Sequence, residues 1–121
     1  MNLYLCGPMT HKVAPNLNKD AFDEAASRLR QEHEVVNPAE NPETWDYATC
    51  MRADIEAVLD CDAVVVLPRW EEGVGTRVEV SVALAIGTPV LRYDLFGGLP
   101  ELYSATAGRY ALYAFLKGSP A

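Results

Sequence analysis

The sequence predicts one α/β domain over residues 1–121, in which a parallel sheet carries helices on both faces. Two observations predict it. Short runs of β-branched and aliphatic residues alternate along the chain with longer segments whose apolar residues recur every three or four positions. Glycine, proline or asparagine stands at most of the junctions. This alternation is typical of a parallel sheet with right-handed crossovers, here of the flavodoxin-like (Rossmann-like) kind with the strand order 2-1-3-4.

The first half of the chain contains two predicted strands and two predicted helices. A short apolar strand over residues 2–6 ends at a Gly-Pro turn, and a helix follows from about Asn18. Residues 35–36 form the second strand, and a second helix spans about 44–59. The apolar residues expected on the buried sides of the two helices are Ala21, Phe22, Ala25, Ala26 and Leu29, and then Met51, Ile55, Val58 and Leu59.

The second half begins with the most regular part of the pattern. Residues 62–67 are a β-branched strand, 73–75 are a glycine loop, and a nearly all-apolar helix runs from there to Gly87 as its stop. A strand at 90–93 and a last helix over about 101–116 complete the chain. The apolar helix is expected to be buried against the sheet, so the few polar residues on it need an explanation.

Composition narrows the classes of partner. The formal net charge of −7 leaves no basic face for a nucleic acid. No apolar run is long enough for a membrane helix, and the start lacks the features of a signal peptide, so a cytoplasmic protein is expected. Three scattered cysteines indicate reduced thiols. The two histidines lack partners at ligand spacing, so no metal is expected, and no cofactor either.

Glu79 is the polar residue of the apolar helix that most needs an explanation. One interpretation is a capping box, in which Thr76 caps the helix and Glu79, three residues on, reaches back to the cap. The other is a catalytic carboxylate, because the start of this helix lies at the carboxyl end of the preceding strand, where open α/β sheets bind their ligands.

The predicted strand order brings the loops at 7–14 and 67–75 together across one crevice. The residues expected to contact a ligand there are Gly7, Pro8, Met9, Thr10, Trp70, Gly73 and Gly75. Tyr4 stands at a strand end from which its hydroxyl could reach Glu79, and Asp54 is expected at the same edge, on the helix that leads into the third strand. The glycines form G-x-G after the third strand rather than the dinucleotide fingerprint after the first.

Three of these residues have a structural alternative. Tyr4 could be a half-buried strand aromatic, Trp70 could cover the core, and Asp54 could be a solvated residue beside Arg52. Cys6 lies close enough to the crevice for a reactive thiol to be considered.

Three segments resemble the nucleoside 2-deoxyribosyltransferases and the related 2′-deoxynucleoside 5′-phosphate N-hydrolases. The first is Tyr4-Leu5-Cys6-Gly7-Pro8-Met9. The second is Arg52-Ala53-Asp54-Ile55 with Asp60-Cys61-Asp62-Ala63-Val64-Val65. The third is Gly75-Thr76-Arg77-Val78-Glu79 with Ala83-Leu84-Ala85-Ile86-Gly87-Thr88-Pro89-Val90. The chain is most similar to small bacterial and viral members that share the Gly-Pro-Met start and Leu67-Pro68-Arg69-Trp70.

The resemblance implies cleavage of a nucleoside at C1′. Glu79 would be the nucleophile, Tyr4 would orient it, and Asp54 would contact the sugar and assist the leaving base. Carboxylates suit this reaction because its transition state is oxocarbenium-like and the departing base needs a proton. Water and a second base both remain possible acceptors of the sugar.

The resemblance implies a small-molecule partner, a nucleoside or nucleotide, and a homo-oligomer. Lys12, Arg69 and Arg77 are outnumbered by carboxylates near the crevice, which slightly favours an uncharged nucleoside over a monophosphate. The aromatic residues Tyr103, Tyr110, Tyr113 and Phe115 are candidates for a subunit contact. Two other functions stay open: a non-catalytic module that binds a nucleotide-like ligand, and, more weakly, a flavin-binding electron carrier.

Overall fold

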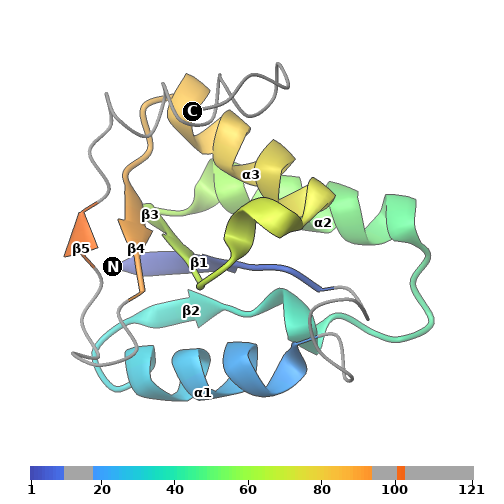
Figure 1. Ribbon diagram of the computed structural model, residues 1–121, viewed down its shortest axis with the longest axis horizontal. Helices are drawn as coiled ribbons and strands as arrows, with labels where there is room; N and C mark the ends of the chain where they lie inside the picture. Colours follow the sequence, from blue (N-terminus) through green and yellow to red (C-terminus); the bar gives the residue numbers. More distant parts are fainter. Residues whose placement is uncertain (10–17, 94–100, 103–121) are drawn as a thin grey trace.

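The computed structural model describes residues 1–9, 18–93 and 101–102. In these stretches the chain forms a sheet with the order β2-β1-β3-β4-β5. Four strands run parallel to one another: β1 (Asn2–Cys6), β2 (Glu34–Val36), β3 (Ala63–Val66) and β4 (Val90–Arg92). The short β5 (Glu101–Leu102) pairs antiparallel with β4. The α/β fold class and the predicted order of the first four strands are confirmed (Figure 1).

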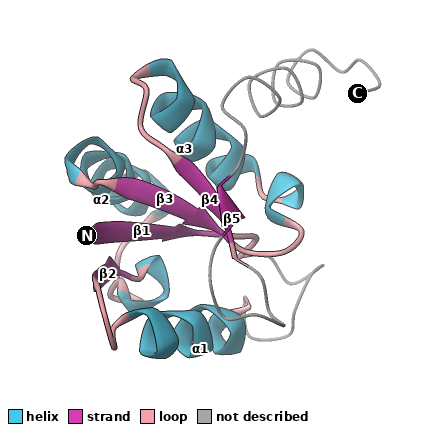
Figure 2. Ribbon diagram, turned by 90° about the vertical axis from the view of Figure 1, so that its left-hand side faces the viewer, coloured by secondary structure: helices cyan, strands magenta, loops and turns pink. Residues whose placement is uncertain are grey.

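Helices cover both faces of the sheet, as the sequence predicts. Helix α1 (Lys19–Leu29) packs on one face, and α2 (Tyr47–Asp60) and α3 (Val74–Ala85) lie together on the other (Figures 1 and 2). Two single 3₁₀ turns, η1 (Pro38–Glu40) and η2 (Trp70–Glu72), follow β2 and β3. Both turns stand at the carboxyl edge of the sheet, so they shape the region in which a ligand is expected.

Alternation along the strands divides the core into two halves. On β1, Leu3 and Leu5 pack towards α1, with the apolar residues Phe22, Ala25, Ala26 and Leu29 of that helix. Tyr4 and Cys6 point to the opposite face, towards α2 and α3. This period of two follows from the pleat of a strand, which sends successive side chains to opposite faces. The tyrosine and the cysteine of β1 therefore share one side.

Helix α2 begins later than the predicted residue 44. The Asp46 side chain accepts a hydrogen bond from the Thr49 N–H at 2.8 Å and so caps the helix in front of Tyr47. Val58 is fully buried, but Leu59 is 53% exposed, so the expectation that Leu59 lies on the buried side is wrong. Val58 is the fully buried residue of α2, and it belongs to the core cluster that also contains residues of β1, β3 and α3.

The predicted last helix, over about 101–116, does not begin at residue 101. Glu101 and Leu102 form β5, because their backbone completes the edge of the sheet beside Arg92 and Leu91. Residues 103–116 of that helix lie outside the described residues, as do Thr10 and the four aromatic residues expected at a subunit contact. Self-association therefore stays a prediction.

Among the described helices, none combines the length and the apolar character that crossing a membrane requires.

Candidate active site

Glu79 lies on the buried stripe of α3. The helix buries Thr76, Glu79, Val80, Ala83 and Leu84, which is the spacing of a helix face that packs against a sheet. The helix begins at Val74 with Gly73 as its N-cap, so Thr76 is inside the first turn and Glu79 is in the second. The capping-box interpretation is therefore wrong. The N-cap is Gly73 rather than Thr76, and Glu79 lies six positions after Gly73 instead of the three that a capping box requires.

The start of α3 is fixed by contacts with the loop that follows β1. The Thr76 hydroxyl donates a hydrogen bond of 2.6 Å to the Gly7 carbonyl oxygen. A Cβ on Gly73 would lie 2.8 Å from the Thr76 hydroxyl and 3.3 Å from the Pro8 Cα, so only glycine fits there without displacing its neighbours. The two loops that the sequence placed across a crevice are thus in direct contact, and they set the position of α3 against β1.

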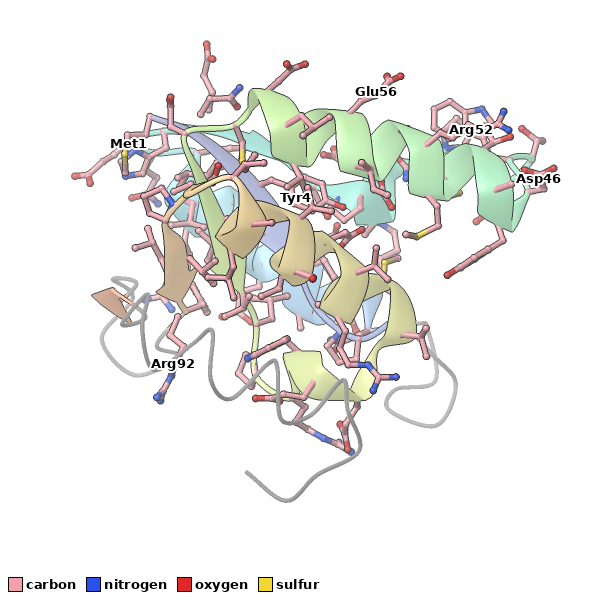
Figure 3. All side chains as sticks on the ribbon, turned by 90° about the horizontal axis from the view of Figure 1, so that it is seen from above. Met1, Tyr4, Asp46, Arg52, Glu56 and Arg92 are labelled. Atoms are coloured by element: carbon pink, nitrogen blue, oxygen red, sulfur yellow. The ribbon has the colours of Figure 1, made fainter. Side chains whose placement is uncertain are left out.

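Both oxygens of the Glu79 carboxylate accept a hydrogen bond from β1. The Tyr4 hydroxyl donates to Oε1 at 2.9 Å, and the Cys6 thiol donates to Oε2 at 3.2 Å. Tyr4 is completely buried, and Glu79 is only 5% exposed. In Figure 3, Tyr4 lies between α2 and α3, while Arg52 and Glu56 point outward from α2. Both donors are neutral groups, so the carboxylate is oriented by them without being neutralised.

Burial dominates the ionisation of this cluster. It raises the pKa of Glu79 from 4.5 to about 7, and the negative charge of Asp54 acts in the same direction, while the bonds from Cys6 and Tyr4 oppose the rise. Burial together with the adjacent Glu79 charge also raises the pKa of Tyr4 and the pKa of Cys6. Tyr4 and Cys6 therefore keep their protons at neutral pH, whereas Glu79 titrates there.

Asp54 lies on the neighbouring helix and faces the same space. Its Oδ1 accepts a hydrogen bond of 3.0 Å from the Asn41 side chain, which comes from the segment between η1 and α2. Partial burial raises the pKa of Asp54, and the hydrogen bond from Asn41 opposes this. Asp54 is thus held by Asn41, whereas Arg52, the partner in the alternative interpretation, points outward (Figure 3).

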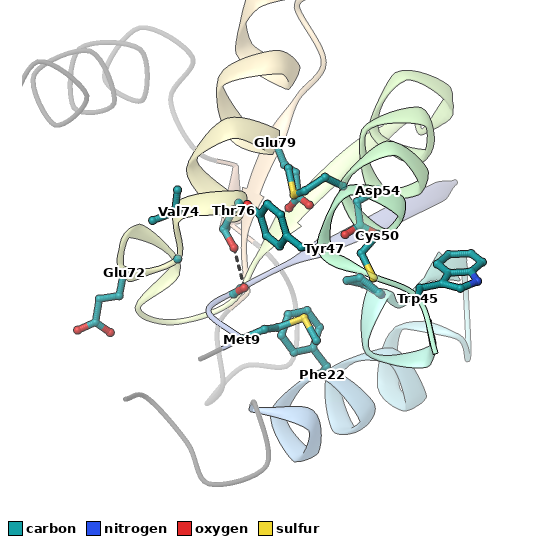
Figure 4. A pocket seen from close by; sticks show the side chains of 15 residues that line it. Met9, Phe22, Trp45, Tyr47, Cys50, Asp54, Glu72, Val74, Thr76 and Glu79 are labelled. Atoms are coloured by element: carbon teal, nitrogen blue, oxygen red, sulfur yellow. Dashed lines mark hydrogen bonds between the residues drawn. The ribbon is translucent and has the colours of Figure 1, made fainter. Parts of the chain in front are cut away.

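A pocket of about 380 Å³ opens at the carboxyl edge of the sheet, beside these two carboxyl groups (Figure 4). Its walls come from the loop after β1, from α1, from the start of α2 and from the start of α3. The lining residues are Gly7, Met9, Phe22, Pro38, Trp45, Tyr47, Cys50, Met51, Asp54, Glu72, Gly73, Val74, Gly75, Thr76 and Glu79. The walls are mostly apolar or aromatic, and the charged side chains among them are carboxylates. Such a pocket suits a small, partly aromatic ligand.

The structure brings most of the predicted site residues to this pocket. Gly7, Met9, Gly73, Gly75, Asp54 and Glu79 line it. Tyr4 lies behind Glu79 rather than on the wall, while Pro8 and Trp70 are buried, Trp70 in the same core cluster as Tyr4. Within the described ranges, no group of His, Cys, Asp and Glu is arranged to hold a metal ion.

The model of one protein family matches residues 1–92, and its description is "Domain of unknown function (DUF4406)". The chain belongs to the DUF4406 family. No curated protein sequence matches this DUF4406 chain. The residues of the site described above all fall inside the matched range.

Solved structures resemble the DUF4406 chain in fold. A 2-deoxyribosyltransferase from Bacillus psychrosaccharolyticus, described as a biocatalyst for nucleoside synthesis, superimposes with a TM-score of 0.61 at 18% identity, over 85% of this chain and 99% of that one. A conserved protein from Enterococcus faecalis V583 gives a TM-score of 0.56 at 24% identity, over 76% of this chain and 62% of that one. At the level of the fold, the resemblance to the 2-deoxyribosyltransferases is confirmed.

Sequence reasoning missed the wall that the start of α2 provides in the DUF4406 chain. Tyr47, Cys50 and Met51 precede Asp54 by seven, four and three positions and share its helix face. That spacing was the available signal, because any residue one or two turns from a pocket carboxylate on the same face also meets the pocket. Trp45 and Phe22 gave no such signal, since their place depends on how a loop and α1 approach the sheet edge.

Proposed function

We propose that this chain cleaves the bond between base and sugar in a nucleoside, either as an N-glycosidase or as a base-exchanging deoxyribosyltransferase, with Glu79 as the nucleophile. One observation carries the proposal. A buried carboxylate at the wall of a ligand-sized pocket has both oxygens oriented by neutral donors, which leaves it ionisable near neutral pH. The shared fold with a 2-deoxyribosyltransferase supports the same reaction class.

The proposed reaction has two displacements at C1′. An oxygen of Glu79 bonds to C1′ while the bond from C1′ to the base nitrogen breaks, and the base leaves with that electron pair. Asp54, whose pKa is raised, donates a proton to the departing base. Water or a second base then attacks C1′ while the bond from C1′ to the Glu79 oxygen breaks. The Asp54 carboxylate takes up the proton that the water or base gives up, so both side chains return to their starting states. Each Glu79 oxygen keeps a lone pair for this step, because Tyr4 and Cys6 each occupy only one.

An uncharged nucleoside is the proposed substrate, in preference to its 5′-monophosphate. Asp54, Glu72 and Glu79 are the charged side chains on the described pocket wall. Arg69 lies beside Glu72 and makes a hydrogen bond of 2.9 Å with its carboxylate, so its charge is already directed at a partner. A doubly negative phosphate would meet like charge in this pocket.

Incubation with a panel of nucleosides and matched monophosphates, followed by chromatography of the free bases, tests the proposal. We expect base release from at least one nucleoside, with a higher kcat/KM than from its monophosphate. Glu79→Gln keeps the side-chain shape but removes the charge, so turnover should fall ~10³-fold or more. Including a second base in the reaction separates hydrolysis from transfer.

Matched controls make the result decisive. Arg52→Ala alters a residue of α2 that is close to Asp54 in the sequence but points outward, so turnover should stay unchanged. Binding of a nucleoside by calorimetry without any base release, in both parent protein and Glu79→Gln, would instead identify a non-catalytic binding module. Unchanged turnover in Glu79→Gln would contradict the proposed nucleophile.

A further inference from the structure

Two donors on one face of β1 meet the two oxygens of one carboxylate. Tyr4 and Cys6 are separated by one residue, so the pleat sends both to the α3 side. The long tyrosine side chain reaches Oε1 and the short thiol reaches Oε2, at 2.9 and 3.2 Å. A carboxylate bonded at one oxygen can still rotate about its last torsion, whereas one bonded at both oxygens is fixed in its plane.

We propose that Cys6 is a positioning residue for Glu79, whose thiol fixes the plane of the carboxylate and stabilises its ionised form. This inference rests on the proposed function only for its effect on turnover. The effect on Glu79 itself follows from the hydrogen bond. Cys6 does not touch the pocket, because it is absent from the lining residues and only 1% exposed. Cys6 therefore acts on a bound ligand only through Glu79.

The thiol is suited to donate and unsuited to react. Burial and the adjacent Glu79 charge raise the pKa of Cys6 well above its usual range, so the sulfur keeps its proton. A buried thiol that keeps its proton is a poor nucleophile but remains a hydrogen-bond donor. This removes the reactive-thiol interpretation of Cys6 and gives the side chain a different role beside the same carboxylate.

The direction of the effect on Glu79 can be derived from its surroundings. The groups that face Glu79 are Tyr4 and Cys6 from β1 and the Asp54 carboxylate from α2, while β3 adds Val64 and Val66 to the same cluster. Tyr4 and Cys6 favour the ionised form, and Asp54 disfavours it. Removing the Cys6 donor therefore raises the pKa of Glu79 further and lowers its ionised fraction at neutral pH.

Three variants separate donation from packing. Cys6→Ala removes the donor, and Cys6→Ser restores a donor at the same position. Cys61→Ala is the matched control, because Cys61 belongs to the same core cluster and its thiol donates to the Val58 carbonyl at 3.2 Å, away from Glu79. Thermal unfolding of all three variants measures the loss of packing, which the two alanine variants should share.

The first measurement needs no substrate. A ¹³C NMR titration follows the side-chain carboxyl carbons of the glutamates, and the resonance that is missing from Glu79→Gln belongs to Glu79. We expect its pKa to rise by about one unit in Cys6→Ala and to stay within about 0.3 unit of the parent value in Cys6→Ser and Cys61→Ala. An unchanged Glu79 titration in Cys6→Ala would overturn the proposal.

The second measurement is the pH profile of base release. The acid limb of kcat/KM should move up by about one unit in Cys6→Ala, which is ~10-fold at pH 6, with kcat rather than KM carrying the loss. Cys6→Ser should restore the parent profile. If the NMR titration shifts but no variant releases base, the proposed function fails and the role of Cys6 stands. If base is released with an unshifted limb in Cys6→Ala, the role of Cys6 fails.

Discussion

The two faces of β1 differ in what they bury. Leu3 and Leu5 meet α1 through apolar contacts alone, whereas Tyr4 and Cys6 meet α3 through hydrogen bonds to one carboxylate. Both faces are equally buried, so solvent exposure does not distinguish them. The two faces differ chemically. On the α1 face, removal of apolar surface from water stabilises the folded protein. On the α3 face, burial disfavours the ionised form of a carboxyl group. The proposed function therefore assigns catalysis to the α3 face of this strand, while the α1 face contributes apolar packing.

The largest effect is expected when one side chain is changed on each face of β1. Leu5→Ala leaves a cavity on the apolar face and should lower the free energy of unfolding by ~2–5 kcal/mol, with kcat/KM per folded molecule retained. Tyr4→Phe removes one hydroxyl from the other face and should lower kcat by ~10²-fold, with a loss of unfolding free energy of ~1 kcal/mol. Urea unfolding and initial rates measure the two quantities. An equal loss of activity in both variants would show that the two faces of β1 do not differ in their effect on turnover.

The next effect is a pH dependence of stability that only the α3 face has. The pKa of Glu79 is 4.5 in its ordinary state and about 7 in the folded protein, so the folded state binds the proton more tightly. The stability linked to Glu79 is complete below pH 4.5, falls as pH rises, and is lost above pH 7. The loss amounts to ~3 kcal/mol over this range.

Glu79→Gln isolates this dependence, because every other carboxyl group is common to both proteins. The unfolding free energy of Glu79→Gln relative to the parent protein should rise by ~3 kcal/mol between pH 4.5 and pH 8 in urea titrations. Parallel pH profiles of the two proteins would mean that burial does not raise the pKa of Glu79.

The smallest effect is expected at Asn41, whose side chain donates a hydrogen bond to Asp54, the second carboxylate of the site. Asn41→Ala removes the hydrogen bond of 3.0 Å to Asp54 and should lower kcat/KM by ~10-fold, because the carboxyl group is then free to rotate. The same substitution should have almost no further effect in an Asp54→Asn background. Additive losses in this double-mutant cycle would show that Asn41 acts independently of Asp54.

The sequence was sufficient to predict the four parallel strands of the sheet, but not β5, and to place the two carboxylates at its carboxyl edge. The β-branched runs and the glycine stop at Gly87, which has a φ of +80°, define the βαβ unit around α3. Glu79 could be singled out because a carboxylate on an otherwise apolar helix contradicts the pattern around it. Its distance from Thr76 is also that of a capping box, and only the observed start at Val74 excludes that interpretation.

The rest of the site depends on contacts between segments that are distant in the sequence. Glycine is required at position 73 because Pro8 and Thr76 leave no room for a side chain. The second donor to Glu79 depends on where β1 places Cys6 relative to α3. Asn41 reaches Asp54 because η1 turns the chain back across the sheet edge. None of these contacts leaves a periodic signal, since each joins residues that lie far apart in the sequence or in a loop.

The proposed reaction forms a covalent bond between Glu79 and C1′, and trapping this bond would identify the nucleophile. A 2′-fluoro analogue of the nucleoside substrate slows hydrolysis of the glycosyl-enzyme, because fluorine disfavours positive charge at the neighbouring carbon. After incubation and proteolysis, mass spectrometry should locate the fluorosugar on the peptide that contains Glu79, and on Glu79 itself. Release of the base with no adduct, or with the adduct on another residue, would show that Glu79 is not the nucleophile.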